Sequence, residues 1–412
     1  MKEYFENLKN ISKNAKLFLI GGIFNGIGMS VFQLLFNLYL KDSGKTETQI
    51  GFILSSGSLG ATLVAIPAAL LIERLHIKHI LLVTTVLASM AYIMQVFFTD
   101  MSLILFFSFL ASMFITVYRI SSAPFFMRNS TSKERIYLFS TSAALMMGSA
   151  LIGFLIGGFL PKLIRSMGNE IGVIDSYRYS LYISIVASLI SLIPFFMIHE
   201  DTKPNDKRNI FSRMMHYNWH LMGKLIVPKL FVGMGAGLII PFMNLYFRNV
   251  FNQESASIGS FFSILQVFMF LAMMSAPLLA KRFGMLRSIV ITELISIPFM
   301  LVLALTTNLT IAVVAFVFRG TLMNMNVPIS SNFEMELVKK DEQAFTNAMS
   351  MLAWNGAWTI SAHFGGAIIE KHSFQYSFYI TIALYLCSAL SYYFFFRSID
   401  ESNFHFERFR EK

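Results

Sequence analysis

Charged residues are scarce in this chain of 412 residues. Lys, Arg, Asp and Glu make up 14% of it, and 55% of the residues are hydrophobic, whereas an average soluble domain is about 25% charged. The 43 Phe residues outnumber Asp and Glu together, at 23. So little polar surface could not cover so large an apolar core in water. The composition excludes a soluble protein and indicates an integral membrane protein.

Cysteine and catalytic motifs are also scarce. The single cysteine, Cys387, has no partner for an intrachain disulfide. No glycine-rich phosphate loop, Ser-His-Asp arrangement or carboxylate pair stands out, so we expect neither an enzyme nor a bound cofactor or metal. The net charge of +10 lies in short loops without interleaved aromatics. This distribution favours contact with membrane lipid over nucleic acid.

Long apolar runs dominate what is present. Each is long enough to cross a bilayer as a helix. Most of the 33 Lys and Arg residues fall in the loops on the side of the termini, which predicts a cytoplasmic membrane protein with both termini in the cytoplasm. Twelve such windows lie at about 17–40, 49–72, 78–98, 101–126, 136–161, 177–198, 223–247, 257–280, 285–306, 308–333, 343–369 and 374–396.

The two halves of the sequence repeat each other at an offset of roughly 208 residues. Asn37 in the first half corresponds to Asn244 in the second, and Ile50-Gly51 corresponds to Ile258-Gly259. Six spans per copy give both copies one orientation, related by an axis along the membrane normal. We expect an all-α membrane fold of two six-helix bundles, 1–198 and 221–412. A cytoplasmic linker with an interfacial amphipathic helix, 199–220, joins them.

This pattern, with a basic loop after the second span, resembles the major facilitator superfamily of secondary transporters. Residues 69–78 read Ala-Leu-Leu-Ile-Glu-Arg-Leu-His-Ile-Lys and are similar to the family's loop signature Gly-x-Leu-x-Asp-Arg-x-Gly-Arg-Arg. The resemblance implies that Glu73, Arg74 and Lys78 gate the cytoplasmic side, and that the protein is a monomer. Residues 124–131 and 319–326 resemble a poorly characterised bacterial branch, which assigns no substrate.

Residues 149–158 in span five are similar to the family's antiporter signature, Gly-x-x-x-Gly-Pro-x-x-Gly-Gly, with Phe154 in place of the proline. Small residues let helix backbones approach closely. The signature therefore favours helix packing together with export. The helix-packing candidates are Gly153, Gly157 and Gly158, with Gly365 and Gly366 in the second half.

Away from the ends of the expected spans, five charged or titratable residues (Arg119, Lys229, Glu293, Arg319 and His363) lie where charge is expensive and normally faces a cavity or a partner. In the family, spans four and ten line the central cavity, so Arg119 and Arg319 are candidates to bind an anionic group. The alternative is that they hold helices together. Glu293 and His363 are candidates for carrying protons, although Glu293 could instead be a structural partner of Arg319. We expect Lys229 to reach the membrane interface.

Neutral polar and aromatic residues extend the list of substrate-binding candidates. Trp354 and Trp358 share one helix face with Asn355 beside it, which could stack an aromatic ligand or simply pack against another helix. The remaining candidates are Asn25, Gln33, Asn37, Asn244 and Asn326.

Together these features predict a secondary active transporter of a small organic, anionic or amphipathic molecule, working by alternating access. Proton-linked efflux is the preferred mode, and an uptake symporter of the same fold is the close alternative. A non-transporting membrane sensor or scaffold is the alternative from another class, and the lack of a soluble output domain counts against it.

Overall fold

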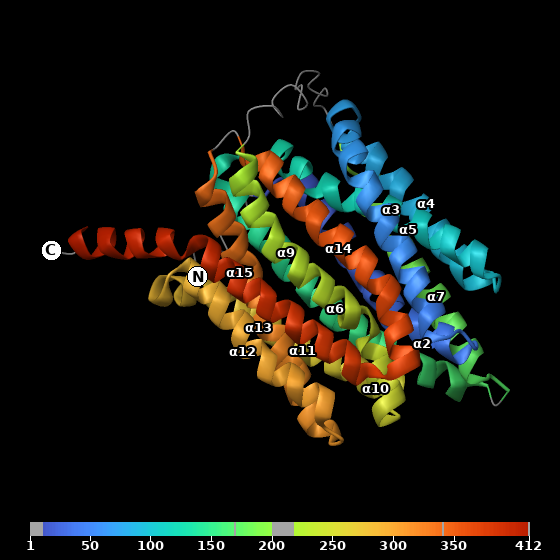
Figure 1. Cartoon of the computed structure of the whole chain (residues 1–412). Helices are drawn as coiled ribbons and strands as arrows, with labels where there is room; N and C mark the ends of the chain where they lie inside the picture. The colour runs from blue at the N-terminus through green and yellow to red at the C-terminus, as the bar shows by residue number, and fades with distance from the viewer. Residues whose placement is uncertain (1–10, 169, 200–217, 340–341, 411–412) are drawn as a thin grey trace. The chain divides into compact units, whose positions relative to one another are not determined.

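The computed structural model describes residues 11–168, 170–199, 218–339 and 342–410 (Figure 1). Within these ranges the chain forms α-helices and one short 3-10 helix, and no strand. The prediction of an all-α fold is therefore confirmed.

The first half of the described chain contains long, nearly uninterrupted helices joined by short connections. Ser191 separates α7 from the short α8, which together occupy the place of the sixth expected span. The helices are α2 (Lys13–Asp42), α3 (Glu47–Arg74), α4 (Ile77–Phe97), α5 (Met101–Arg128), α6 (Ser132–Met167), α7 (Val173–Ile190) and α8 (Leu192–Phe196).

The second half repeats this arrangement with one interruption. Pro241 lies in the 3-10 helix η2 (Ile240–Phe242), which divides the seventh span because proline cannot donate the backbone hydrogen bond of an α-helix. The α-helices are α9 (Trp219–Ile239), α10 (Met243–Phe251), α11 (Ser255–Phe283), α12 (Met285–Leu305), α13 (Leu309–Leu337), α14 (Gln343–His372) and α15 (Phe374–Arg410).

In the described residues, 11 segments are long and apolar enough to cross a membrane. The twelfth expected span corresponds to α14, which has 30 residues but is not among the 11. Polar residues along α14, such as Asn355 and His363, lower its hydropathy. Polar residues in a spanning helix are typical of a helix that faces the protein interior or a cavity on at least one side.

The helices gather into two compact units. Unit 1 comprises the described residues of Met1–Arg208 together with Asn244–Gln266, and unit 2 those of Asn209–Met243 and Val267–Lys412. Unit 1 thus includes a segment from the second sequence repeat, whereas the boundaries proposed from the sequence follow the repeat itself. The linker proposed at 199–220 falls mostly outside the described residues.

Each unit has its own apolar core. In unit 1, aromatic rings of Phe18, Phe125 and Phe195 pack together, with the Phe18 and Phe125 ring centroids 4.7 Å apart. In unit 2, Phe333 meets Phe396 edge to face at 5.3 Å. Buried aromatic pairs of this kind contribute about 0.5–1.5 kcal/mol each beyond their buried area.

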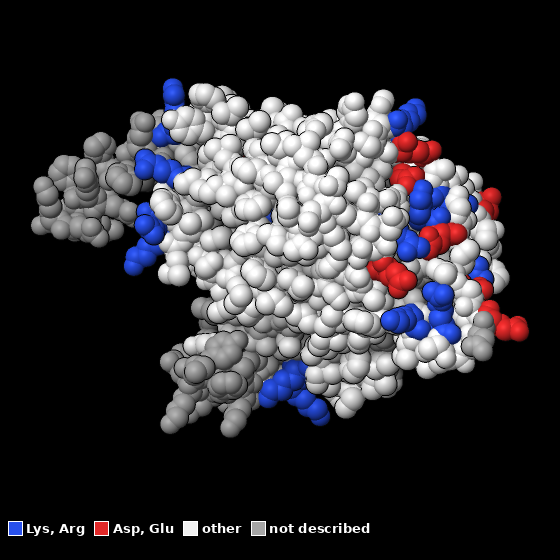
Figure 2. Space-filling model, turned by 90° about the horizontal axis from the view of Figure 1, so that it is seen from below, with Lys and Arg blue, Asp and Glu red and all other residues white. Residues whose placement is uncertain are grey.

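Charged side chains cluster near the ends of the helices. Figure 2 shows basic residues at one end, a broad surface almost free of charge, and mixed acidic and basic residues at the other end. Among the charged residues at the helix ends of unit 1 are the ion pairs Lys41–Glu47, Asp175–Arg178 and Asp42–Arg248. An uncharged band between charged ends is the distribution expected of a membrane-spanning protein.

Glycines permit several close helix contacts. A Cβ atom on Gly153 would lie 2.7 Å from the Ile27 carbonyl oxygen, and one on Gly157 would lie 3.1 Å from Val31 Cα, so α6 packs backbone to backbone on α2. In unit 2, a Cβ atom on Gly365 would lie 2.8 Å from the Leu238 carbonyl oxygen. Gly366 is buried beside it.

Candidate functional site

Arg119 is an exposed charge in the middle of a spanning helix. It lies on α5 nine residues before Arg128 at the helix end, or about 13 Å along the axis. Its guanidinium group interacts electrostatically with Tyr92 and Tyr118. Within the described residues it forms no ion pair. A charge at this depth is costly in hydrocarbon and normally faces a cavity or a partner, so Arg119 remains a candidate binding residue.

The polar candidates on α2 have different surroundings. Gln33 is exposed, whereas Asn25 is only 6% exposed. Gly22, one turn before Gly26, faces Tyr118, whose hydroxyl would lie 3.8 Å from an added Cβ atom. The α2 helix therefore lies near Tyr118, the neighbour of Arg119, at Gly22. In the described residues no hydrogen bond joins Arg119 to Asn25 or Gln33.

The two asparagines related by the sequence repeat bind each other. Asn37 Nδ2 donates to Asn244 Oδ1 at 3.3 Å, and Asn244 Nδ2 donates to the Leu34 carbonyl oxygen at 2.9 Å. Both are at most 4% exposed. These two substrate-binding candidates are therefore engaged with each other and with backbone in this structure.

Further polar contacts within unit 1 attach the segment 244–249 to the end of α2 and the start of α3. Arg248 pairs with Asp42 at 3.2 Å, and Asn249 Nδ2 donates to Glu47 at 2.8 Å. Glu47 also pairs with Lys41 at 2.6 Å. We call the contacts Asn37–Asn244, Asp42–Arg248 and Glu47–Asn249 the 244–249 latch.

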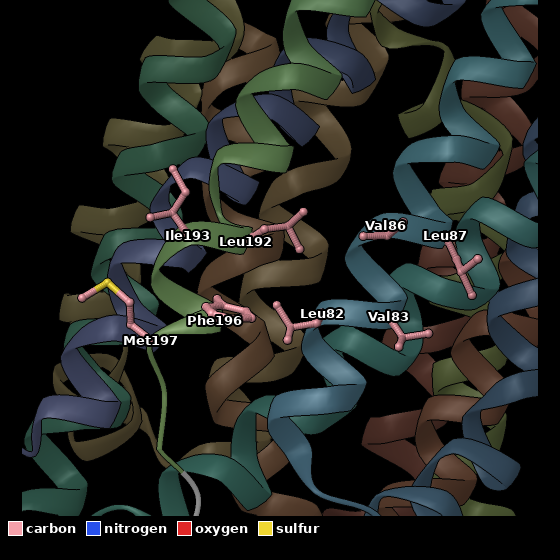
Figure 3. Close-up of a pocket in the computed structure, with 8 residues that line it drawn as sticks. All are labelled: Leu82, Val83, Val86, Leu87, Leu192, Ile193, Phe196 and Met197. Atoms are coloured by element: carbon pink, nitrogen blue, oxygen red, sulfur yellow. The ribbon is translucent and has the colours of Figure 1, made fainter.

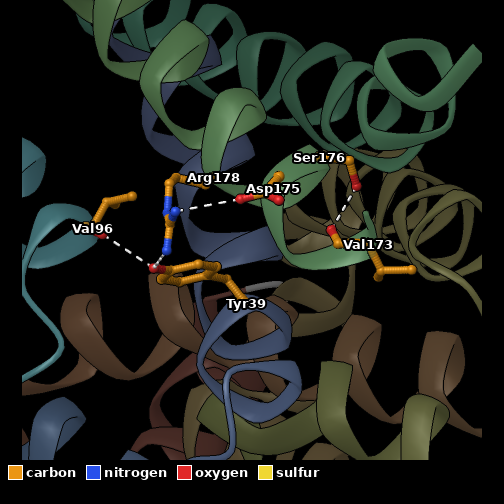
Figure 4. A network of polar contacts seen from close by, with 6 residues as sticks. All are labelled: Tyr39, Val96, Val173, Asp175, Ser176 and Arg178. Carbon is orange, nitrogen blue, oxygen red and sulfur yellow. Dashed lines mark hydrogen bonds and ion pairs between the residues drawn. The ribbon is translucent and has the colours of Figure 1, made fainter. Parts of the chain in front are cut away.

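A neighbouring network ties three helix ends together (Figure 4). Tyr39 of α2 donates from its hydroxyl to the Val96 carbonyl oxygen of α4 at 3.1 Å. Arg178 of α7 pairs with Asp175 at 3.3 Å and donates to the Tyr39 hydroxyl at 3.5 Å. Every charged group here has a partner in the protein, so we interpret this network as structural.

Arg319 differs from Arg119 because it is only 5% exposed. Its guanidinium donates to the Tyr385 hydroxyl and lies 5.6 Å from the centroid of that ring. Arg319 therefore links α13 to α15. This contact favours the helix-holding alternative for Arg319.

Glu293 is 1% exposed and accepts a hydrogen bond from Asn326 Nδ2 at 3.2 Å. The expectation that Arg319 would be its partner is wrong, because Arg319 turns to Tyr385 and forms no ion pair in the described residues. Asn326, a substrate-binding candidate, is thus directed to Glu293.

Lys229 and Glu334 form a buried ion pair that the sequence did not predict. Lys229 Nζ lies 2.7 Å from the Glu334 carboxylate, whose side chain is 1% exposed, and Ser350 donates to that carboxylate at 3.0 Å. The expectation that Lys229 reaches the interface is wrong, because this acid holds it. The signal was the lysine itself, since a lysine inside a span calls for an acidic partner.

The tryptophan pair lies on α14, with ring centroids 6.0 Å apart. Their backbones pack on α9, where Cβ atoms on Gly233 and Gly237 would lie 3.1 Å and 2.9 Å from the carbonyl oxygens of Trp354 and Trp358. Asn355 lies between them and is half-buried, and His363 is exposed further along the helix. The helix face that carries Trp354, Asn355 and Trp358 remains a candidate binding surface.

The gating candidates are only partly described. Glu73 and Arg74 end α3, and their side chains lie outside the described residues. Lys78 lies over the Phe196 ring, 5.1 Å from its centroid. Beside this contact, α4 and α8 with the following Met197 border an apolar pocket, whose eight lining residues Figure 3 labels. All eight of these residues are apolar, so the pocket is suited to a lipid chain rather than to a charged solute.

In the described residues, no group of three or more His, Cys, Asp or Glu side chains could hold a metal ion. The polar features of the spans that the structure describes include an exposed arginine, an exposed histidine and several buried clusters. Such intramembrane polar groups are typical of transport proteins.

Solved structures share this fold at low sequence identity. A bacterial homologue of the human lysosomal transporter Spinster, inward-facing and unoccupied, has a TM-score of 0.76 at 14% identity, covering 92% of this chain and 96% of that one. A mutant of the nucleoside transporter NupG has a TM-score of 0.77 at 12% identity, with coverages of 92% and 98%. A D-xylose–proton symporter has a TM-score of 0.72 at 14% identity, with coverages of 95% and 97%.

No curated protein matches the sequence significantly. One known protein family, in contrast, matches the sequence over residues 18–362 and again over residues 227–412. The two matches together cover nearly the whole chain. With the all-helical fold and its membrane-spanning segments, this match shows that the chain belongs to the Major Facilitator Superfamily.

Proposed function

We propose that this chain is a secondary active transporter that exports a small organic molecule of anionic or amphipathic character, and that Arg119 binds its anionic group. The exposure of Arg119 in the middle of α5, without an ion pair in the described structure, carries the proposal. A guanidinium group binds carboxylate or phosphate through two parallel hydrogen bonds. Tyr118 and Tyr92 beside it supply aromatic surface for the rest of such a molecule.

Alternating access is the mechanism we propose, with the 244–249 latch joined in one state and released in the other. Its contacts are of a kind that can break and reform, since they are hydrogen bonds and one ion pair, Asp42–Arg248, whose side chains are partly exposed. The close approach of α6 and α11 at Gly158 and Gly259 belongs to the same joined state. A Cβ atom on Gly158 would lie 3.2 Å from Gly259 Cα.

Export rests on the resemblance of 149–158 to the antiporter signature, whose Gly153, Gly157 and Gly158 pack tightly. Proton linkage is the mode we propose for export, with the exposed His363 as a candidate group. We further propose that the protein works as a monomer in the cytoplasmic membrane with both termini in the cytoplasm.

A ligand panel tests the role of Arg119. Full-length protein purified in detergent is heated with organic anions, cations and neutral amphiphiles. We expect some anions to raise the Tm of the wild type by about 3 °C or more at saturating concentration. Arg119→Gln should abolish this shift, because the substitution removes the charge while keeping hydrogen-bonding capacity.

Arg165→Gln is the matched control, since Arg165 is an exposed arginine in the same unit at the end of α6. It should keep the anion-induced shift. Equal stabilisation of wild type and Arg119→Gln by every active anion would contradict the proposed role of Arg119.

A further inference from the structure

The apolar pocket between α4 and α8 is a groove on the surface of unit 1 (Figure 3). It has a volume of about 670 Å³, within the range of roughly 300–1,000 Å³ that is usual for ligand pockets. Val83 on its α4 side is 54% exposed, and Phe196 on its α8 side is 71% exposed. The groove is therefore open along its length, and its apolar walls are suited to an apolar chain.

The groove has the length of one membrane leaflet. Along α4 its lining residues begin at Leu82 and end at Leu87, and Lys78 lies one turn before Leu82 on the same helix face. Lys78 and Leu87 are nine residues apart, or about 14 Å along the helix. Because the hydrocarbon of a bilayer is about 30 Å thick, this stretch of α4 crosses about half of it.

One end of the groove is basic. The Lys78 ammonium group lies 5.1 Å from the centroid of the Phe196 ring, which is part of the groove wall. His79 is exposed one turn before Val83, and its ring lies 5.8 Å from the ring of His76. The first turn of α4 contains no acidic residue. The groove thus joins an apolar wall to a positively charged end.

The start of α2 adds basic residues at the same end of unit 1. Asn14 Nδ2 donates to the His199 carbonyl oxygen at 2.6 Å, and the His199 backbone nitrogen donates to Asn14 Oδ1 at 3.1 Å. These two hydrogen bonds hold the start of α2 beside the segment that follows α8. Lys13 and Lys16 are exposed on α2, whose first turn also lacks an acidic residue.

This charge distribution selects among the amphiphiles of a membrane. A matching ligand has an apolar chain with a negative group at one end. The phosphate of an anionic phospholipid forms charge-assisted hydrogen bonds with an ammonium group, and basic residues beside a membrane attract such lipids. A zwitterionic lipid also carries a cation, which the basic end of the groove repels.

We propose that the groove between α4 and α8 binds one anionic phospholipid, with an acyl chain along Val83 and Phe196 and the phosphate group at Lys78. The lipid contacts both α4 and α8, so its binding stabilises unit 1. This site is separate from the proposed substrate site at Arg119 and does not depend on the proposed function.

Thermal unfolding of the full-length protein in detergent tests the site. Tm is measured with added phosphatidylglycerol, with phosphatidylcholine of the same acyl chains, or with oleate. We expect phosphatidylglycerol to raise the Tm of the wild type by about 3 °C or more over phosphatidylcholine, because a ligand that binds only the folded state stabilises it. Oleate should give a smaller shift, since it has no phosphate group.

Two variants each remove one part of the site. Lys78→Gln removes the charge, and Val83→Trp fills the groove, so each should abolish the advantage of phosphatidylglycerol over phosphatidylcholine. Arg282→Gln is the control for charge, because Arg282 likewise lies over a phenylalanine ring, that of Phe283, at 5.3 Å. Val314→Trp is the control for bulk, since Val314 is 47% exposed on α13. Both controls should keep the advantage.

Equal Tm in the two phospholipids would overturn the proposal and indicate ordinary surrounding lipid. An equal effect of oleate would overturn it in favour of a fatty acid. The advantage of phosphatidylglycerol must also be lost in Lys78→Gln and kept in Arg282→Gln; either opposite result contradicts the site. Should Val83→Trp fail to fold, Lys78→Gln decides the question. The measurement involves no substrate, so its failure would leave the proposed function intact.

Discussion

Lys229→Met is expected to lower the free energy of unfolding by about 3–5 kcal/mol, because it leaves the Glu334 carboxylate buried without a counter-charge. Glu334 is 1% exposed, and after the substitution only Ser350 would still donate to it. Methionine has nearly the length of the lysine stem, so the space that the lysine side chain fills stays largely filled. The loss should appear as a lower Tm and a lower midpoint in denaturant.

The double variant Lys229→Met/Glu334→Gln separates charge from packing. It should recover much of the lost stability, since the uncompensated charge is gone. Lys371→Met is the matched control, because Lys371 is exposed at the end of α14. A Lys229→Met protein as stable as the Lys371→Met protein would show that Lys229 does not compensate Glu334.

Gly259→Leu is expected to disrupt the contact of α11 with α6. A Cβ atom on Gly259 would overlap the Phe154 carbonyl oxygen and lie 2.8 Å from Gly158 Cα, and both are backbone atoms that cannot move aside alone. Overpacking typically costs 1–3 kcal/mol, and about 1.4 kcal/mol changes a population tenfold. The state with the 244–249 latch joined should therefore become about tenfold rarer.

Cysteine accessibility measures this change without a substrate. Ser255, which is 6% exposed, donates to the Gly158 carbonyl oxygen and is not a latch residue, is replaced by cysteine in a Cys387→Ser background and labelled with a membrane-impermeant thiol reagent. Gly259→Leu should raise the labelling rate about tenfold in proportion to the open population. Gly148→Leu is the control, since no atom lies within 4 Å of a Cβ atom there. Equal labelling of both glycine variants would contradict the proposed role of this contact.

The fold was predictable because membrane-spanning helices carry a strong sequence signal. The apolar windows, their even number and the repeat that relates Asn37 to Asn244 can all be recognised in the sequence alone. The break of the seventh span at Pro241 has an equally local cause. Assignment of the segment 244–266 to unit 1, however, depends on contacts such as Asp42–Arg248 that join residues about 200 positions apart.

The surroundings of the candidate residues could be predicted only in part, because the sequence does not show how each helix is rotated about its axis. Arg119 and Arg319 look alike in sequence, because both interrupt helices that are apolar on nearly every side. Which way each side chain points depends on how its helix is turned against its neighbours, and the structure leaves one exposed and buries the other against Tyr385. Glu334 was overlooked because it lies one residue beyond the expected end of span ten.

Which polar side chains pair with each other between helices could likewise not be predicted from the sequence. Asn326 is a plausible substrate ligand in isolation, and only the packing of α12 on α13 shows that it binds Glu293. The Lys229–Glu334 pair similarly requires α9 and α13 to be neighbours. A sequence read alone shows which polar groups need partners, whereas the identity of each partner follows from the tertiary structure.

The most direct test of export through an Arg119-dependent site is transport in proteoliposomes. Vesicles contain wild-type, Arg119→Gln or Arg165→Gln protein, and movement of the most stabilising anion is followed under an imposed proton or sodium gradient. We predict gradient-driven transport by wild type and Arg165→Gln and at least tenfold slower transport by Arg119→Gln. Absence of transport by wild type, or equal rates in all three proteins, would contradict this proposed function.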